Sequence, residues 1–153
     1  MANALDHIDT FHHNAYILSP ILERFYSFCK CKEKNILLSY LIFPLLLYPE
    51  SRIKLKSANK NSSIYTIFSD QELLYGLSDR VDTLKRLTNT CLLVLLHNNS
   101  ITVTDSMSVK YNSSNLEYSL CTNEMLRAAK NLAILFNSHE IVEIYRKLGI
   151  KKL

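Results

Sequence analysis

Glycine is scarce in this sequence. Only two of the 153 residues, Gly76 and Gly149, are glycines, whereas average usage of about 7% predicts roughly ten. A loop that wraps a phosphate group needs backbone without side chains and often a positive φ angle. Because the two glycines lie far apart, the sequence argues against a P-loop and against a dinucleotide-binding turn. The scarcity also favours a helical fold with few tight turns, and we expect no nucleotide cofactor.

Paired metal-ligand spacings are missing as well. The four cysteines are Cys29, Cys31, Cys91 and Cys121, whereas zinc sites normally combine two closely spaced pairs of ligands. The residues after Met1 are mostly polar, with two acids and three histidines, and include no apolar leader segment. We therefore expect a reducing, cytoplasmic location, free thiols and no structural metal.

No group of residue types typical of catalysis is present. A nucleophile elbow needs a glycine on each side of its serine, two residues away, and no serine in the sequence has both. Glu140 and Glu143 lie three residues apart and are followed by Arg146 and Lys147, a spacing that favours surface ion pairs on a helix. We expect no catalytic residue and infer that the protein is not an enzyme.

Long hydrophobic runs are absent too. The longest apolar stretch, residues 36–48, has 13 residues and includes Ser39 and Pro44, whereas a membrane-spanning helix needs ~20. We predict a helix buried in a core, kinked or split at Pro44 because proline lacks the backbone donor. No contact with a membrane is expected.

Helix signals are plentiful by contrast. Ser19 and Pro20 predict the start of a first helix, because serine caps helices and proline fits the first helical position. Gly149 predicts a left-handed cap at the end of the last helix, with Ile150 making the apolar contact that accompanies such a cap.

Two short stretches within residues 101–111 predict strands. Residues 101–104 and 108–111 alternate in polarity and are rich in β-branched side chains. A short hairpin directly after helices is typical of a winged helix. We therefore predict a mainly α fold with a small β-hairpin, as a single winged-helix-like domain over residues 16–153. A flexible N-terminal arm over residues 1–15 would precede it.

The positive charge is concentrated in one region. The net charge is +4, and between residues 30 and 60 seven basic residues face two acidic ones. Such a stretch can follow a phosphate backbone or an acidic protein surface, although a solvated face is the commoner explanation. Residues 51–61 look like an exposed basic connection, and the hairpin could add to the sheet edge of a partner. The candidate partner- or DNA-binding residues are Arg52, Lys54, Lys56, Lys60, Thr102, Thr104 and Lys110.

The order of segments resembles a known family, the middle component of three-component ABC systems, a group that includes Lamassu-type bacterial defence. The resemblance runs from Asn14 to the end of the chain. It rests on LSPILERF at 18–25, LIFPLLLYPESR at 41–52, LYGLSDRV at 74–81, RAAKNLA at 127–133 and IYRKLGI at 144–150. These stretches determine a fold, and none is a catalytic signature.

The resemblance implies an adaptor in anti-phage or anti-plasmid defence. Its partners would be an SMC-like ABC ATPase, present as two subunits whose heads it bridges, and an effector, often a nuclease, kept inactive until foreign DNA is sensed. DNA could be reached through the complex. The alternative is a free-standing winged-helix regulator that binds DNA directly as a homodimer, with a steep salt dependence.

Overall fold

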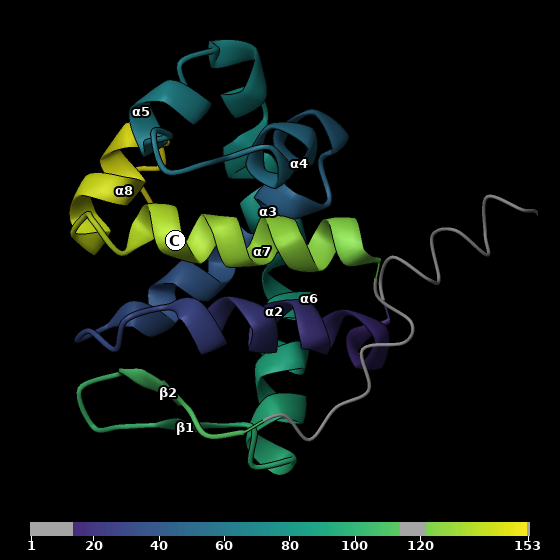
Figure 1. Cartoon of the computed structure of the whole chain (residues 1–153). Coiled ribbons are helices and arrows are strands. Elements are labelled where there is room, and N and C mark those ends of the chain that lie inside the picture. The colour runs from purple at the N-terminus through teal and green to yellow at the C-terminus, as the bar shows by residue number, and fades with distance from the viewer. Residues whose placement is uncertain (1–13, 114–121, 153) are drawn as a thin grey trace, which may run out of the picture.

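The computed structural model describes residues 14–113 and 122–152, and its polypeptide is mainly helical with one hairpin (Figure 1). The prediction of a mainly α fold with a small β-hairpin is confirmed. The three longest helices are α2 (Ala15–Phe28), α6 (Leu77–His97) and α7 (Asn123–Phe136). The shorter elements are η1 (Asn35–Leu38), α3 (Ser39–Leu46), α4 (Pro49–Lys56), α5 (Ile64–Ile67), η2 (Gln71–Leu74), β1 (Ile101–Val103), β2 (Val109–Tyr111) and α8 (Ile141–Lys147).

The core lies between the long helices. α2 packs against α7 and α6, α3 packs against α6, and α4 packs against α7, so that α2 and α7 run across the molecule and α6 crosses them (Figure 1). Phe25 and Phe136 meet edge to face with their ring centroids 6.1 Å apart, and both are almost fully buried. Burying one such large apolar side chain contributes roughly 1.5–3 kcal/mol, so these contacts hold the helices together.

Helix α2 begins earlier than Ser19 and Pro20 predicted. Asn14 caps it, because its side-chain oxygen accepts hydrogen bonds from the backbone N–H groups of Tyr16 and Ile17 at 3.0 and 3.4 Å. Pro20 lies inside the helix, where its missing donor deprives only the carbonyl one turn back, that of the exposed Tyr16. Apart from Asn14 and Ala15, the predicted N-terminal arm lies outside the described residues.

The apolar stretch at 36–48 forms η1 and α3, which confirms its burial in the core. Pro44 lies inside α3 and does not split it; the chain turns instead before Pro49, at the start of α4. Among the described residues no single helix is long and apolar enough to cross a membrane. Asn35–Leu46 and Pro49–Lys56 have the length and composition of a membrane span only when taken together, and the chain bends by 106° between them.

The prediction of an exposed connection at 51–61 is wrong for its first half. Pro49–Lys56 is helix α4, and Ser51 and Leu55 are buried in it. Pro49 is preorganised for the first helical turn. Glu50 at the start and Lys54 and Lys56 at the end complement the helix dipole. These local signals favour a helix although the segment is polar.

The hairpin follows α6 directly and has the predicted place and polarity. Its strands are antiparallel, with Thr102 opposite Lys110 and Val103 opposite Val109. β2 is the inner strand and contacts α2, whereas β1 lies on the outer side (Figure 1). This order is compatible with a winged helix.

Helix α8 ends as predicted. Gly149 has a φ angle of +73°, and the N–H of Ile150 donates to the carbonyl of Tyr145 at 3.1 Å. Ile150 is only 5% exposed, so it makes the apolar contact of this cap.

Candidate partner-binding surfaces

Two of the predicted basic residues on α4 share one acidic partner. Arg52 Nε lies 3.7 Å and Lys56 Nζ 3.8 Å from Oε1 of Glu124, at the start of α7. Arg52 also donates from Nη1 to the carbonyl of Leu46 at 3.0 Å. The side chain of Arg52 therefore ties α4 to α7 and to the end of α3. Glu124 offsets part of the positive charge of α4.

The other two predicted lysines have different surroundings. Lys54 Nζ lies 3.7 Å from Asp70 Oδ2, and both side chains are nearly half exposed. Lys60 takes part in no ion pair within residues 14–113 and 122–152, and it lines a groove of about 400 Å³ together with Lys130 and His139. The fold thus adds a second cation, Lys130, to the groove of Lys60, which no local sequence pattern indicates.

Asn131 forms one wall of this groove and fixes the end of α4. Its side-chain amide donates to the carbonyls of Leu55, Lys56 and Ala58 at 2.9, 3.3 and 3.4 Å. The last carbonyls of a helix have no partner within the helix, so this one amide closes α4 and holds it against α7.

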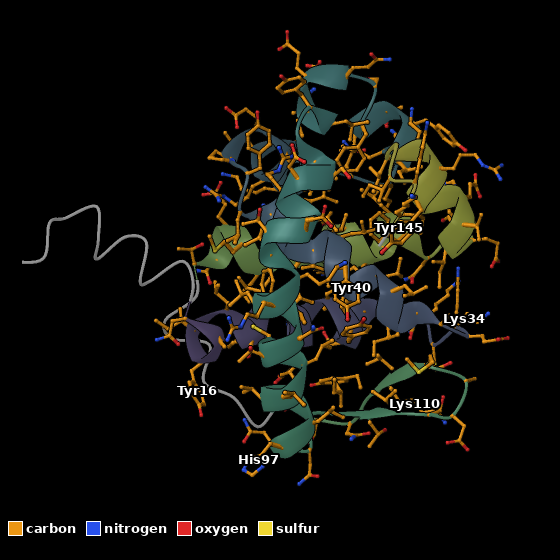
Figure 2. The ribbon with its side chains drawn as sticks, turned by 180° about the vertical axis from the view of Figure 1, so that it is seen from behind. Tyr16, Lys34, Tyr40, His97, Lys110 and Tyr145 are labelled. Atoms are coloured by element: carbon orange, nitrogen blue, oxygen red, sulfur yellow. The ribbon has the colours of Figure 1, made fainter. Side chains whose placement is uncertain are left out.

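The three predicted residues of the hairpin divide into two groups. Thr102 and Lys110 face each other across the strands and are exposed; Lys110 is labelled in Figure 2. Thr104 belongs to the turn, where its backbone N–H donates to the carbonyl of Ser108 at 2.9 Å and its hydroxyl lies 2.9 Å from that of Ser106. Thr102 and Lys110 are therefore free for a partner, whereas Thr104 shapes the turn.

Asn35, which is fully buried, covers the edge of β2 that faces away from β1. The N–H of Val109 donates to Oδ1 of Asn35 at 2.6 Å, and Nδ2 of Asn35 donates back to the carbonyl of Val109 at 3.4 Å. The backbone N–H of Lys34 adds a bond to the carbonyl of Ser106 at 3.0 Å, and Lys34 and Lys110 lie on the same side of the molecule (Figure 2). The backbone groups of Val109 are therefore not available to a partner strand.

The outer edge of β1 is open at one end only. The ladder bonds alternate along an antiparallel pair, and Thr104 bonds Ser108, so the backbone groups of Ile101 and Val103 are directed away from β2. Within the described residues no hydrogen bond reaches those groups. Ile101 is only 1% exposed, whereas Val103 is partly exposed. The edge that a partner strand could reach is therefore centred on Val103.

Glu143 of the last helix has a surface ion pair, as the spacing predicted, but its partner is His139 rather than Arg146 or Lys147. Glu143 accepts a hydrogen bond from the Tyr65 hydroxyl at 2.7 Å and lies 3.0 Å from Nδ1 of His139. The bond to Tyr65, with that to His139, lowers the pKa of Glu143, and the same contact raises the pKa of Tyr65. The cluster joins α5 to α8, and among the described residues Glu143 forms no ion pair with Arg146 or Lys147.

The thiols of Cys29 and Cys91 lie in or against the core. Burial raises the pKa of Cys29 and of Cys91 from 9.0 to about 11, so both are protonated near neutral pH and are poor nucleophiles. Among the described residues, no three His, Cys, Asp or Glu side chains lie close enough to hold a metal ion.

Residues 14–113 and 122–152 thus form a mainly helical fold with one hairpin. The family model for the ABC-three component (ABC-3C) system Middle Component 3 matches residues 2–152, and the chain belongs to this family. No curated protein and no solved structure matches the chain. The resemblance to a middle component of three-component ABC systems is thereby confirmed, and the chain works with the other components of such a system.

Proposed function

We propose that this chain is a non-catalytic adaptor that holds an SMC-like ABC ATPase and an effector, a nuclease in our hypothesis, in one complex. The complex would act in the cytoplasm in Lamassu-type defence against phages or plasmids. The observation that carries the proposal is the match to a middle-component family over residues 2–152. A middle component of a three-component system has two other components to contact, and contact surfaces are what this chain offers.

The internal contacts suit an adaptor because they hold separate surfaces in a fixed geometry. Asn131 fastens α4 to α7 through three carbonyls, and Asn35 fastens the hairpin to η1 through Val109. Both side chains bond to backbone atoms far away in the sequence. A partner bound at one surface would thus be held at a defined distance from a partner bound at another.

For the hairpin we propose β-strand addition at the free end of β1, with Thr102 and Lys110 beside it. Val103→Pro removes the outward N–H without removing a bond between β1 and β2, and proline occurs on edge strands for this reason. We expect this variant to fold and to lose one partner. Thr102→Pro is the contrasting variant, because it breaks the hairpin itself; unchanged assembly by a folded Val103→Pro protein would refute the strand addition.

For α4 and the following loop we propose contact with DNA held by the ATPase, or with an acidic partner surface, through Lys54, Lys56 and Lys60. Charge reversal at these three residues should weaken the contact. Glu124→Gln should strengthen it, because Glu124 offsets part of the charge of Lys56. Affinity of the purified complex for a DNA duplex at several salt concentrations measures both effects. Unchanged assembly of the complex together with unchanged DNA affinity in these variants would remove this surface from the proposal.

The decisive experiment is co-expression of the tagged chain with the ATPase and the effector of its own system, followed by mass measurement in solution. A stable mixed complex, with the chain more stable in it than alone, supports the adaptor. The hairpin directly after α6 leaves the winged-helix regulator as the second candidate. A homodimer that ignores the ATPase and binds DNA would favour that regulator and overturn the adaptor.

A further inference from the structure

A second groove, which contains none of the seven candidate partner- or DNA-binding residues, lies between η1 and α8. Its volume is about 530 Å³, within the range of ligand-binding clefts. The apolar side chains that line it are Leu37, Ile141, Val142, Tyr145 and Ile150.

The floor of the groove is fixed by the last helix and its cap. Ile141 and Tyr145 lie one turn apart on α8, and the hydroxyl of Tyr145 donates to the carbonyl of Leu37; Tyr145 is labelled in Figure 2. The left-handed turn at Gly149 brings Ile150 back to the helix. Val142 remains 68% exposed, which leaves an apolar side chain in the groove for a partner to cover.

The rim of the groove carries charge of one sign. The charged residues that line it are Arg146, Lys151 and Lys152, all of them basic. Within residues 14–113 and 122–152 none of the three takes part in an ion pair. This sets the groove apart from α4, whose cations are offset by Glu124 and Asp70.

We propose that this groove binds a short acidic segment of a partner protein, in which apolar anchor side chains are flanked by Asp or Glu. The rim supplies the complementary charge, and the exposed Val142 supplies an apolar contact that a nucleic-acid backbone would leave unused. The inference rests on the proposed adaptor function, and it assigns one of the two protein contacts of the adaptor to the α8 groove. Groove-binding segments of this kind present anchors at helical spacing.

The test uses the full chain and a short fluorescein-labelled peptide with leucines at helical spacing and glutamates between them. A peptide with lysines in place of the glutamates and a single-stranded oligonucleotide are the competing probes. The variant is Val142→Glu. The matched control is Leu93→Glu, because Leu93 on α6 is exposed to a similar extent, 66% against 68%, but lies outside the groove. Circular dichroism checks that both variants fold.

We expect the acidic peptide to bind the wild-type chain and the Leu93→Glu control alike, and to lose at least about tenfold in affinity with Val142→Glu. Arg146→Glu should lower the affinity and flatten its salt dependence. Equal binding of the acidic and basic peptides, preference for the oligonucleotide, or an unchanged affinity in Val142→Glu would overturn the proposal. The assay contains neither ATPase nor effector, so failure of the groove is distinguishable from failure of the adaptor, which co-expression reveals.

Discussion

Asn35 satisfies the backbone N–H and carbonyl of Val109, the groups with which a third strand would pair. It is fully buried, and its side-chain amide pairs with both backbone groups of Val109. Asn35→Ala leaves a buried donor and a buried acceptor without partners, which costs roughly 1–3 kcal/mol for each group. We expect urea unfolding to show a loss of about 2–6 kcal/mol in the free energy of unfolding and amide exchange to accelerate at Val109.

The matched control is Asn112→Ala at the other end of the hairpin. Asn112 is exposed, and its amide donates a single bond to the carbonyl of Asn99 at 3.1 Å. Water can replace that bond, so we expect a loss below about 1 kcal/mol. Equal losses in the two variants would show that burial of Asn35 contributes nothing special.

Cys29, Cys31 and Cys91 differ in how far their side chains are buried. Cys31 is exposed, whereas burial raises the pKa of Cys29 and Cys91 to about 11. Because the thiolate is the nucleophile, iodoacetamide at mildly alkaline pH should modify Cys31 before Cys29 and Cys91. The rate at Cys29 should rise about tenfold per pH unit up to its pKa, since the thiolate fraction rises by that factor. Peptide mapping by mass spectrometry measures each rate; a fast reaction of Cys91 in the folded protein would contradict the expectation.

At the scale of elements, the position of α4 depends more on one amide than on its ion pairs. Asn131→Ala removes the bonds to the carbonyls of Leu55, Lys56 and Ala58, and we expect a loss of about 1–3 kcal/mol. Glu124→Gln weakens two partly exposed ion pairs, which are worth about 1 kcal/mol or less. Urea unfolding of the two variants side by side measures the difference. A larger loss in Glu124→Gln would mean that charge, rather than the amide, holds α4.

The cap of α8 gives another prediction for an element. Gly149 has a φ angle of +73°, and no atom lies within 4 Å of the place of an added Cβ. The cost of Gly149→Ala therefore comes from backbone strain alone, and we expect about 1 kcal/mol or slightly more. Gly149→Asn should cost less, because asparagine tolerates the left-handed region better. Thermal unfolding compares the two; equal stability of alanine and asparagine variants would contradict the strain argument.

Elements with local signals could be predicted from the sequence. The hairpin could be predicted because the alternation and the β-branched residues that indicate it lie within residues 101–111. The sequence also predicted the cap at Gly149, because glycine adopts the left-handed conformation at a helix end most readily. Helix α4 was missed, because its buried Ser51 and Leu55 do not form a recognisable apolar stripe and its helix signals lie at the two ends. The start of α2 was misplaced, because Pro20 is also tolerated within the second turn when the carbonyl it leaves unpaired is exposed.

The candidate surfaces were less predictable, because they depend on residues distant in sequence. Nothing near Val109 indicates that Asn35 closes the edge of β2, and nothing near Lys56 indicates that Glu124 offsets its charge. The seven predicted site residues consequently include Arg52 and Thr104, whose contacts are largely internal. The sequence did not indicate the α8 groove, because Leu37 and Val142 are distant in the sequence and line the same groove only in the fold.

At the scale of the whole molecule, an adaptor must bind two partners at once through surfaces that do not depend on each other. The proposed surfaces at β1 and at α8 are on different elements. Both are linked to η1, because Asn35 bonds to Val109 of the hairpin and Leu37 accepts a bond from Tyr145 of α8. A rigid support shared by two surfaces keeps their distance fixed without making either contact require the other.

This independence leads to the last prediction. In co-expression with the ATPase and the effector, Val103→Pro should remove one partner and leave the second bound, whereas Val142→Glu should remove the second and leave the first. The double variant should purify alone, because effects at separate sites combine without coupling. Quantitative mass spectrometry of the material that co-purifies with the tagged chain measures all three. If either single variant loses both partners while remaining folded, the two contacts are coupled, and the protein is then a subunit that assembles with its partners as a unit.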